Sequence, residues 1–171
     1  PWNRIKLGQL TERLSEYGAL VIGFDITFPE PDRGVRDLLE SVDLSQLDPV
    51  FSETLNQIED QINGDIYFAN SMQQDADVVL ALNFNAQSSV SYNELPDSIV
   101  DIGKELAKAV TVSDMRGFTG NISILHESSA GSGSMNQQPD VDGVVRRVPL
   151  IIRYGSELFP TLSLEMLRVY N

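Results

Sequence analysis

The chain of 171 residues contains no cysteine and a single histidine, His126. The lack of cysteine excludes a disulfide framework, a thiol nucleophile and a cysteine-based zinc site. It also fits an oxidising compartment, where stray thiols are a liability, although many cytosolic domains lack cysteine too. We therefore expect neither a metal site nor a cofactor.

Positive charge is also scarce. Twelve lysines and arginines stand against 25 acidic residues, which leaves a net charge of −13. Such a charge repels nucleic acid and anionic lipid headgroups, and no basic cluster larger than the pair Arg146 and Arg147 opposes it. A nucleic-acid partner is therefore excluded.

Long hydrophobic runs are missing as well. The longest, 19–24 and 78–82, are far shorter than the roughly 20 residues that a helix needs to cross a bilayer. No basic segment followed by an apolar one marks a secretory signal at the start. We expect the chain to be a fragment of a larger protein, so the membrane helices of that protein would lie outside it.

The hydrophobic residues, 42% of the chain, predict a single globular domain of the α/β class. Leu7, Leu10, Leu14 and Tyr17 share one face of a helix over 4–17. Residues 20–26 and 77–83 are short continuous apolar runs, which are typical of strands buried on both faces. We expect a layered domain with a central mixed sheet flanked by helices.

The remaining elements follow from local patterns. The other expected elements are helices over 49–62, around 99–106 and over 160–170, a short strand at 122–124, an exposed loop over 128–143, and an extended segment over 144–154.

The first candidate site follows the strand at 20–26. Asp25 ends this strand, and the loop after it carries Glu30, Asp32 and Arg33. Ligands of open α/β sheets gather beyond the carboxyl ends of strands. Two carboxylates there could act as general acid and base or hold a divalent cation. The favoured interpretation is structural: Asp25 caps the turn and pairs with an arginine.

The second candidate site surrounds a predicted tight turn at Asp142 and Gly143. Asp140, Asp142 and Gly143 are similar to the start of an EF-hand loop, but the closing glutamate is missing. Alternation along an extended 144–152 places Arg146 on an apolar face. Because a buried guanidinium needs a carboxylate partner, we expect Arg146 to be largely buried against Asp25 or Asp142.

Signs of catalysis are weak. His126 has Glu127 beside it and serines after it, but no nucleophile motif surrounds it. The glycine-rich 130–134 lacks the spacing of a phosphate-binding loop. We expect no enzyme; a hydrolase that uses Asp25 and Glu30 is the weakest of the alternatives.

Two blocks of the sequence resemble a known family. GALVIGFDITFPEPDR (18–33) and QPDVDGVVRRVPL (138–150) are similar to the two blocks of the type-two CHASE domain, the cyclase/histidine-kinase-associated sensory extracellular domain. The stretch 159–167 is similar to the helix that follows in that family. The first candidate site falls in the first block, and Asp140, Asp142, Gly143, Arg146 and Arg147 fall in the second.

The resemblance implies a bacterial sensory domain outside the cytoplasmic membrane, with an undefined small-molecule ligand. It also implies flanking membrane helices, a cytoplasmic cyclase, histidine kinase or similar output, and an architecture in which both chain ends return to one membrane. We therefore expect the helices at 4–17 and 160–170 to share one side of the sheet, with their outer ends close together. A structural or homodimerisation domain without a ligand is the alternative.

Overall fold

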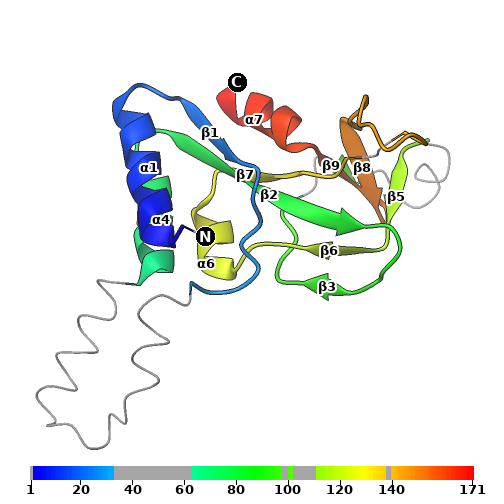
Figure 1. Cartoon of the computed structure of the whole chain (residues 1–171), viewed down its shortest axis with the longest axis horizontal. Helices are drawn as coiled ribbons and strands as arrows, with labels where there is room; N and C mark the ends of the chain where they lie inside the picture. Colours follow the sequence, from blue (N-terminus) through cyan, green and yellow to red (C-terminus); the bar gives the residue numbers. More distant parts are fainter. Residues whose placement is uncertain (1, 33–62, 98–99, 102–110, 138–139) are drawn as a thin grey trace, which may run out of the picture.

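The structure is a computed structural model that describes residues 2–32, 63–97, 100–101, 111–137 and 140–171. The predicted helix over 49–62 and most of the one around 99–106 fall outside these ranges. The described elements are α1 (Arg4–Glu16), β1 (Val21–Phe24), α4 (Gly64–Met72), β2 (Asp77–Asn85), β3 (Ser91–Tyr92), β4 (Val100–Asp101), β5 (Ser113–Met115), β6 (Gly117–Thr119), α6 (Ser123–Ser128), β7 (Gly131–Ser134), β8 (Ile151–Tyr154), β9 (Glu157–Pro160) and α7 (Leu162–Tyr170) (Figure 1).

Helix α1 confirms the prediction for 4–17. It begins after Asn3, whose side chain accepts a hydrogen bond from the Lys6 amide, as a helix N-cap should. Leu7 and Thr11 are buried on the face that packs against α4. Leu10, on the predicted apolar stripe, is 37% exposed, so that stripe is only partly covered.

Strand β2 is the centre of a five-stranded mixed sheet. Residues 77–82 of β2 pair in parallel with β1 and β7, and its last three residues pair antiparallel with β6, which in turn pairs with β3. Residues 78–82 are completely buried, which confirms the predicted buried strand. Strand β1, predicted to be buried on both faces, pairs with β2 and is the edge strand of this sheet among the described residues. Leu20 and Ile26 at its two ends are exposed as a result.

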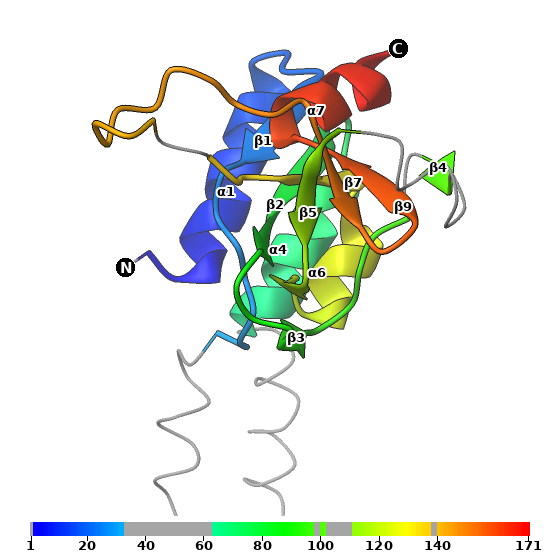
Figure 2. The ribbon, with the colours of Figure 1, turned by 90° about the vertical axis from the view of Figure 1, so that its right-hand side faces the viewer.

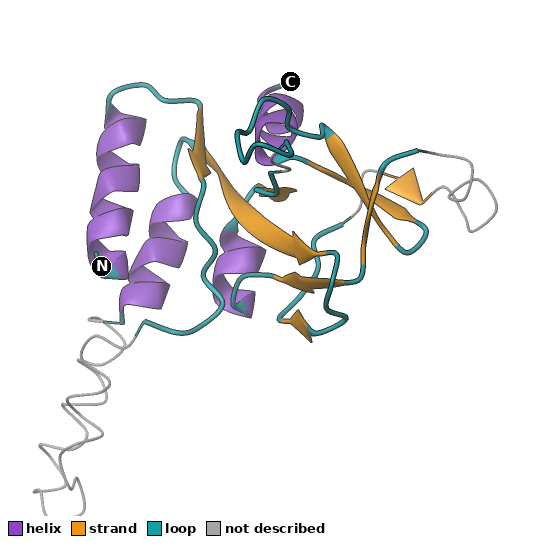
Figure 3. Cartoon of the chain, turned by 45° about the vertical axis from the view of Figure 1, so that its right-hand side comes forward, coloured by secondary structure: helices purple, strands orange, loops and turns teal. Residues whose placement is uncertain are grey.

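Helices cover both faces of the strands β1, β2 and β7. Ile22 and Phe24 of β1 point into the core formed with α1, α4 and α6, whereas a side chain at Gly23 would collide with Met166 of α7. Because successive residues of a strand face opposite sides, α7 lies on the face opposite to α1. Figures 2 and 3 show this arrangement, with the two chain ends apart. The expectation of one shared side with adjacent ends is wrong.

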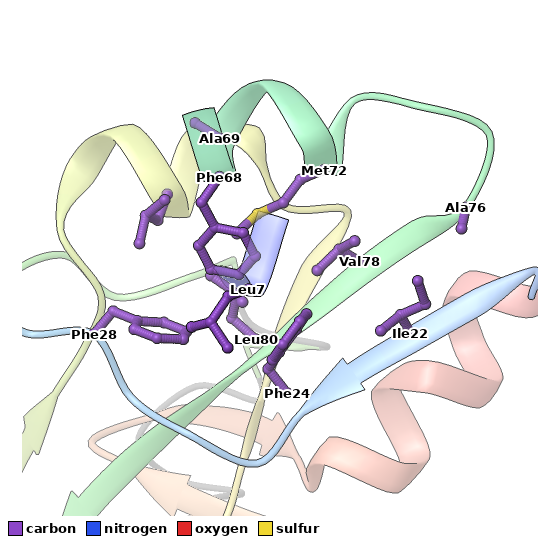
Figure 4. Packing of buried hydrophobic residues seen from close by; sticks show 11 residues of the cluster. Leu7, Ile22, Phe24, Phe28, Phe68, Ala69, Met72, Ala76, Val78 and Leu80 are labelled. Carbon is purple, nitrogen blue, oxygen red and sulfur yellow. The ribbon is translucent and has the colours of Figure 1, made fainter. Parts of the chain in front are cut away.

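The main core lies between these strands and the three helices α1, α4 and α6. Phe68 of α4 meets Phe24 at 5.2 Å and Phe28 at 5.4 Å between ring centroids, both edge to face (Figure 4). Such ring pairs stabilise a core by about 0.5–1.5 kcal/mol each beyond the burial of their area. They fix the segment that follows β1 onto helix α4.

A second core joins the first sheet to a four-stranded sheet in the order β4, β9, β8, β5. Phe84 of β2 lies 5.3 Å from Phe159 of β9, and Ile152 of β8 is fully buried beside them. The α/β class, with a mixed sheet and flanking helices, is confirmed, and this second sheet is an addition to it.

Several local predictions are wrong. The expected strand at 122–124 is the start of α6, because burial of Leu125 against α4 favours a helix. The expected loop over 128–143 contains β7, whose Gly133 lies against α7: a side chain there would be 2.5 Å from the Leu162 Cα. Pro160 ends β9 and does not start α7, and the extended segment forms a strand at Ile151–Tyr154 alone.

Candidate functional site

An apolar groove lies between α1 and β1 and extends along the segment 25–32. Its volume is about 990 Å³, and Leu7, Leu10 and Leu14 of α1 form one wall while Ile22 and Phe24 of β1 contribute to the other. Natural ligand pockets have volumes of about 300–1,000 Å³ and are lined in the same way by apolar side chains with a few polar groups. The groove is therefore the main candidate site among the described residues.

An ion pair made by Arg4 lies beside this groove. The Arg4 guanidinium binds the Asp65 carboxylate and also donates to the Glu30 carbonyl oxygen. Asp32 accepts a hydrogen bond from the Arg4 amide at 2.9 Å, and its own amide donates to Asp65 at 2.9 Å. We call Arg4, Asp32, Asp65 and the Glu30 carbonyl the clamp, since they join α1, α4 and the segment between them.

The clamp is built from the first turns of two helices. The Asn63 side chain caps α4 by accepting from the Asp65 and Ile66 amides. Gly64 follows, and a side chain there would collide with the Asp32 carboxylate, so glycine permits the close approach. Arg4 also lies 5.0 Å from the centre of the Phe28 ring. These contacts compensate the charge of Arg4 within the protein, so Arg4 stabilises the fold.

The structure places the first group of predicted residues at the groove. Asp25, Glu30 and Asp32 all line it, and Asp25 is exposed to solvent there. The predicted pairing of Asp25 with an arginine is not found among the described residues, where Arg4 binds Asp65 instead. Arg33 lies outside the described residues.

The second predicted group lies on the surface. Arg146 binds Asp142 through two hydrogen bonds of 2.9 and 2.8 Å and Asp140 through one of 3.0 Å. The Arg146 side chain is 52% exposed, so the prediction of a buried arginine is wrong although Asp142 is its partner. The reason is that residues 144–150 form no strand and bury no apolar face. The predicted turn is confirmed, with Gly143 at φ +80°.

Hydrogen bonding shifts the ionisation of this surface pair. The bonds from Arg146, supported by the Val144 amide, hold the pKa of Asp142 below its usual value. The same contacts with Asp142 and Asp140 raise the pKa of Arg146. Both groups are therefore charged near neutral pH, and the cluster behaves as a solvated ion pair.

The sequence matches a model of a known protein family. The model of the CHASE2 domain matches residues 1–171, which is the whole chain.

The chain belongs to the CHASE2 family.

CHASE2 domains are extracellular sensory domains found in signalling receptors, and the family is sensory rather than catalytic. A search of curated proteins found no match, and neither did a search of solved structures. Among the described residues of this CHASE2 domain, no helix is both long and apolar enough to cross a bilayer.

A smaller polar cavity of about 240 Å³ contains the single histidine of the CHASE2 domain. His126 is half-buried on α6, and the Ser129 hydroxyl donates to the His126 carbonyl oxygen at 2.8 Å instead of facing the imidazole. Glu165 on α7 is engaged by two hydrogen bonds from Arg168, which raise the pKa of Arg168. Ser129 is therefore not aligned with His126 for acyl transfer.

Sequence reasoning missed Arg4, Asp65 and Asn121 of this CHASE2 domain. Asn121 is 2% exposed; its side chain accepts from the Phe28 amide at 2.7 Å and donates to the Ala81 carbonyl at 2.9 Å. The Asn-Gly-Asp run at 63–65 carries a helix-start signal that would have drawn attention to Asp65. Nothing local marks Arg4 or Asn121, because their partners are distant in the sequence.

Proposed function

We propose that this CHASE2 domain is the extracytoplasmic ligand-binding sensor of a bacterial transmembrane receptor, and that the groove between α1 and β1 holds its ligand. A cytoplasmic cyclase, histidine kinase or similar domain then reads the bound state. The observation that carries the proposal is the large apolar groove beside Asp25 in a domain of a sensory family.

The surroundings of the groove support a signalling role. One wall is helix α1, and the clamp joins the start of α1 to α4 and to the segment after β1. Asn121 links that same segment to the central strand β2. A ligand that binds more tightly to one arrangement of α1 and β1 increases the population of that arrangement. The clamp and Asn121 link this change to α4 and β2.

A thermal-shift screen with small molecules tests the proposal, because a ligand that binds the native state raises the unfolding midpoint. Leu10→Trp fills the groove from a position that is already 37% exposed. Leu167→Trp, on α7 at 59% exposure and outside the groove, is the matched control. Molecules that stabilise the wild type and the control but not Leu10→Trp are the expected result.

Two outcomes contradict the proposal. Ligands that stabilise all three proteins equally bind elsewhere. A domain that binds no ligand but forms a dimer in sedimentation experiments supports a structural dimerisation domain instead.

A further inference from the structure

We propose that the ligand of the groove is a hydrophobic organic cation, whose apolar body lies along α1 and whose protonated amine lies against Asp25. This inference rests on the proposed function of the groove and adds the chemical class of the ligand.

The apolar walls of the groove predict that the ligand has an apolar body. Leu7, Leu10 and Leu14 follow one another along α1, and Leu10 and Ile26 are 37% and 47% exposed at the groove. A ligand that covers them removes apolar surface from water, which is the main driving force for binding in such a pocket. A fully polar molecule would leave this surface without a suitable partner.

The positive charge follows from the charged groups that line the groove. Asp25 supplies the carboxylate on which this argument rests, and the Arg4 guanidinium, which also lines the groove, is already bound by Asp65. An anion would therefore meet unfavourable charge, and a cation favourable charge. Asp25 is exposed, and within the described part of the chain no side chain binds it.

Within the part of the chain that the structure describes, the acids at the groove do not form a chelating site. Among the described residues, no three histidine, cysteine, aspartate or glutamate side chains lie close enough together to hold a metal ion. A divalent cation requires several oxygen ligands at short distance. An ammonium group needs a single carboxylate, and it fits the groove better.

Two further features favour a cation. Trp2 lines the groove and is 66% exposed, which leaves its indole face free to contact a positive group. The net charge of −13 raises the local concentration of cations around the domain and increases their rate of association.

Titration calorimetry with three molecules of matched size tests the inference. The probes are 4-phenylbutylamine, 4-phenyl-1-butanol and 4-phenylbutanoate at pH 7 and low salt. We expect the amine to bind about fivefold more tightly than the alcohol, as a partly exposed ion pair allows, and the carboxylate to bind most weakly. The advantage of the amine should shrink in high salt, because salt screens exposed charges.

Asp25→Asn should reduce the affinity for the amine to that for the alcohol and leave the alcohol unchanged. Asp75→Asn, an exposed acid outside the groove, is the control and should change none of the three affinities. Leu10→Trp should weaken all three probes.

The outcomes separate this inference from the proposed function. If amine and alcohol bind equally, or if the preference survives Asp25→Asn, the ligand class is wrong although the groove still binds. If no probe binds, or if Leu10→Trp has no effect on binding, the groove is not the site and the proposed function fails as well.

Discussion

Two arginine–carboxylate groups in this CHASE2 domain have the same chemistry and opposite surroundings. In the clamp, the side chains of Arg4 and Asp65 are 10% and 8% exposed. In the surface cluster, those of Arg146 and Asp142 are 52% and 56% exposed. Burial, rather than the presence of a bidentate contact, decides how much each pair matters for the fold.

The partners of the two groups differ in sequence distance as well. Arg4 and Asp65 are 61 residues apart and join two helices, so they form only when the chain has folded. Arg146 and Asp142 are four residues apart and close a local turn. A buried charge that loses its partner is strongly destabilising, whereas an exposed one is solvated by water.

Arg4→Met gives the largest expected effect, because it leaves the Asp65 carboxylate buried without its cation. We expect the free energy of unfolding to fall by about 3–5 kcal/mol. Urea denaturation followed by circular dichroism measures this. Arg13→Met removes an arginine that is 69% exposed and pairs with Glu16 on the same helix, and it should change stability little. Equal losses in the two variants would contradict the importance of burial.

The double variant Arg4→Met with Asp65→Leu sharpens the comparison, since it removes both charges together. We expect it to be more stable than Arg4→Met alone by at least about 0.5 kcal/mol in the same urea experiment. The recovery should be incomplete, because the Asp32 amide also loses its acceptor. A double variant less stable than the single one would show that Asp65 supports the fold without Arg4.

Arg146→Met should lower the urea midpoint far less than Arg4→Met does, because water replaces the guanidinium at Asp142 and Asp140. Arg147→Met, an exposed neighbour, is the control. A fall in midpoint comparable to that of Arg4→Met would mean that the surface cluster stabilises the fold after all.

The smallest effect concerns pH. The usual pKa of Asp142 is 3.8, and its hydrogen bonds with Arg146 lower this value in the folded state. A lowered folded pKa contributes stability that is present above pH 3.8 and is lost as pH falls through the folded value. Carboxyl titration by NMR should show a low Asp142 pKa that returns toward the usual value in Arg146→Met. An unchanged pKa in that variant would assign the shift to the turn backbone instead.

Part of the fold could be predicted from the sequence because its determinants are local. The leucine spacing of α1, the apolar run of β2 and the Asp-Gly turn at 142–143 each carry their signal within a few residues. Strand β7 could not be predicted in this way. Its Gly-Ser-Gly-Ser sequence resembles a loop, and it becomes a buried strand because α7 requires small residues beneath it.

The sequence predicts an acidic loop directly after β1, but it does not predict the apolar groove beside that loop. Asp25, Glu30 and Asp32 lie at one groove, as the rule for loops after strands indicates. The apolar walls could not be predicted, because periodicity shows that Leu10 and Leu14 share a face but not whether that face is covered. The burial of Arg146 was inferred from alternation in a strand that does not form.

Asn121 has a consequence for motion within the domain. Its one buried amide holds the Phe28 backbone at the groove and the Ala81 backbone in the central strand. If the segment at the groove opens, the hydrogen bond between the Phe28 amide and Asn121 must break. The Phe28 amide hydrogen should therefore exchange with solvent as slowly as the amide hydrogens of a core strand. Asn121→Ala would uncouple the two and let the groove open on its own.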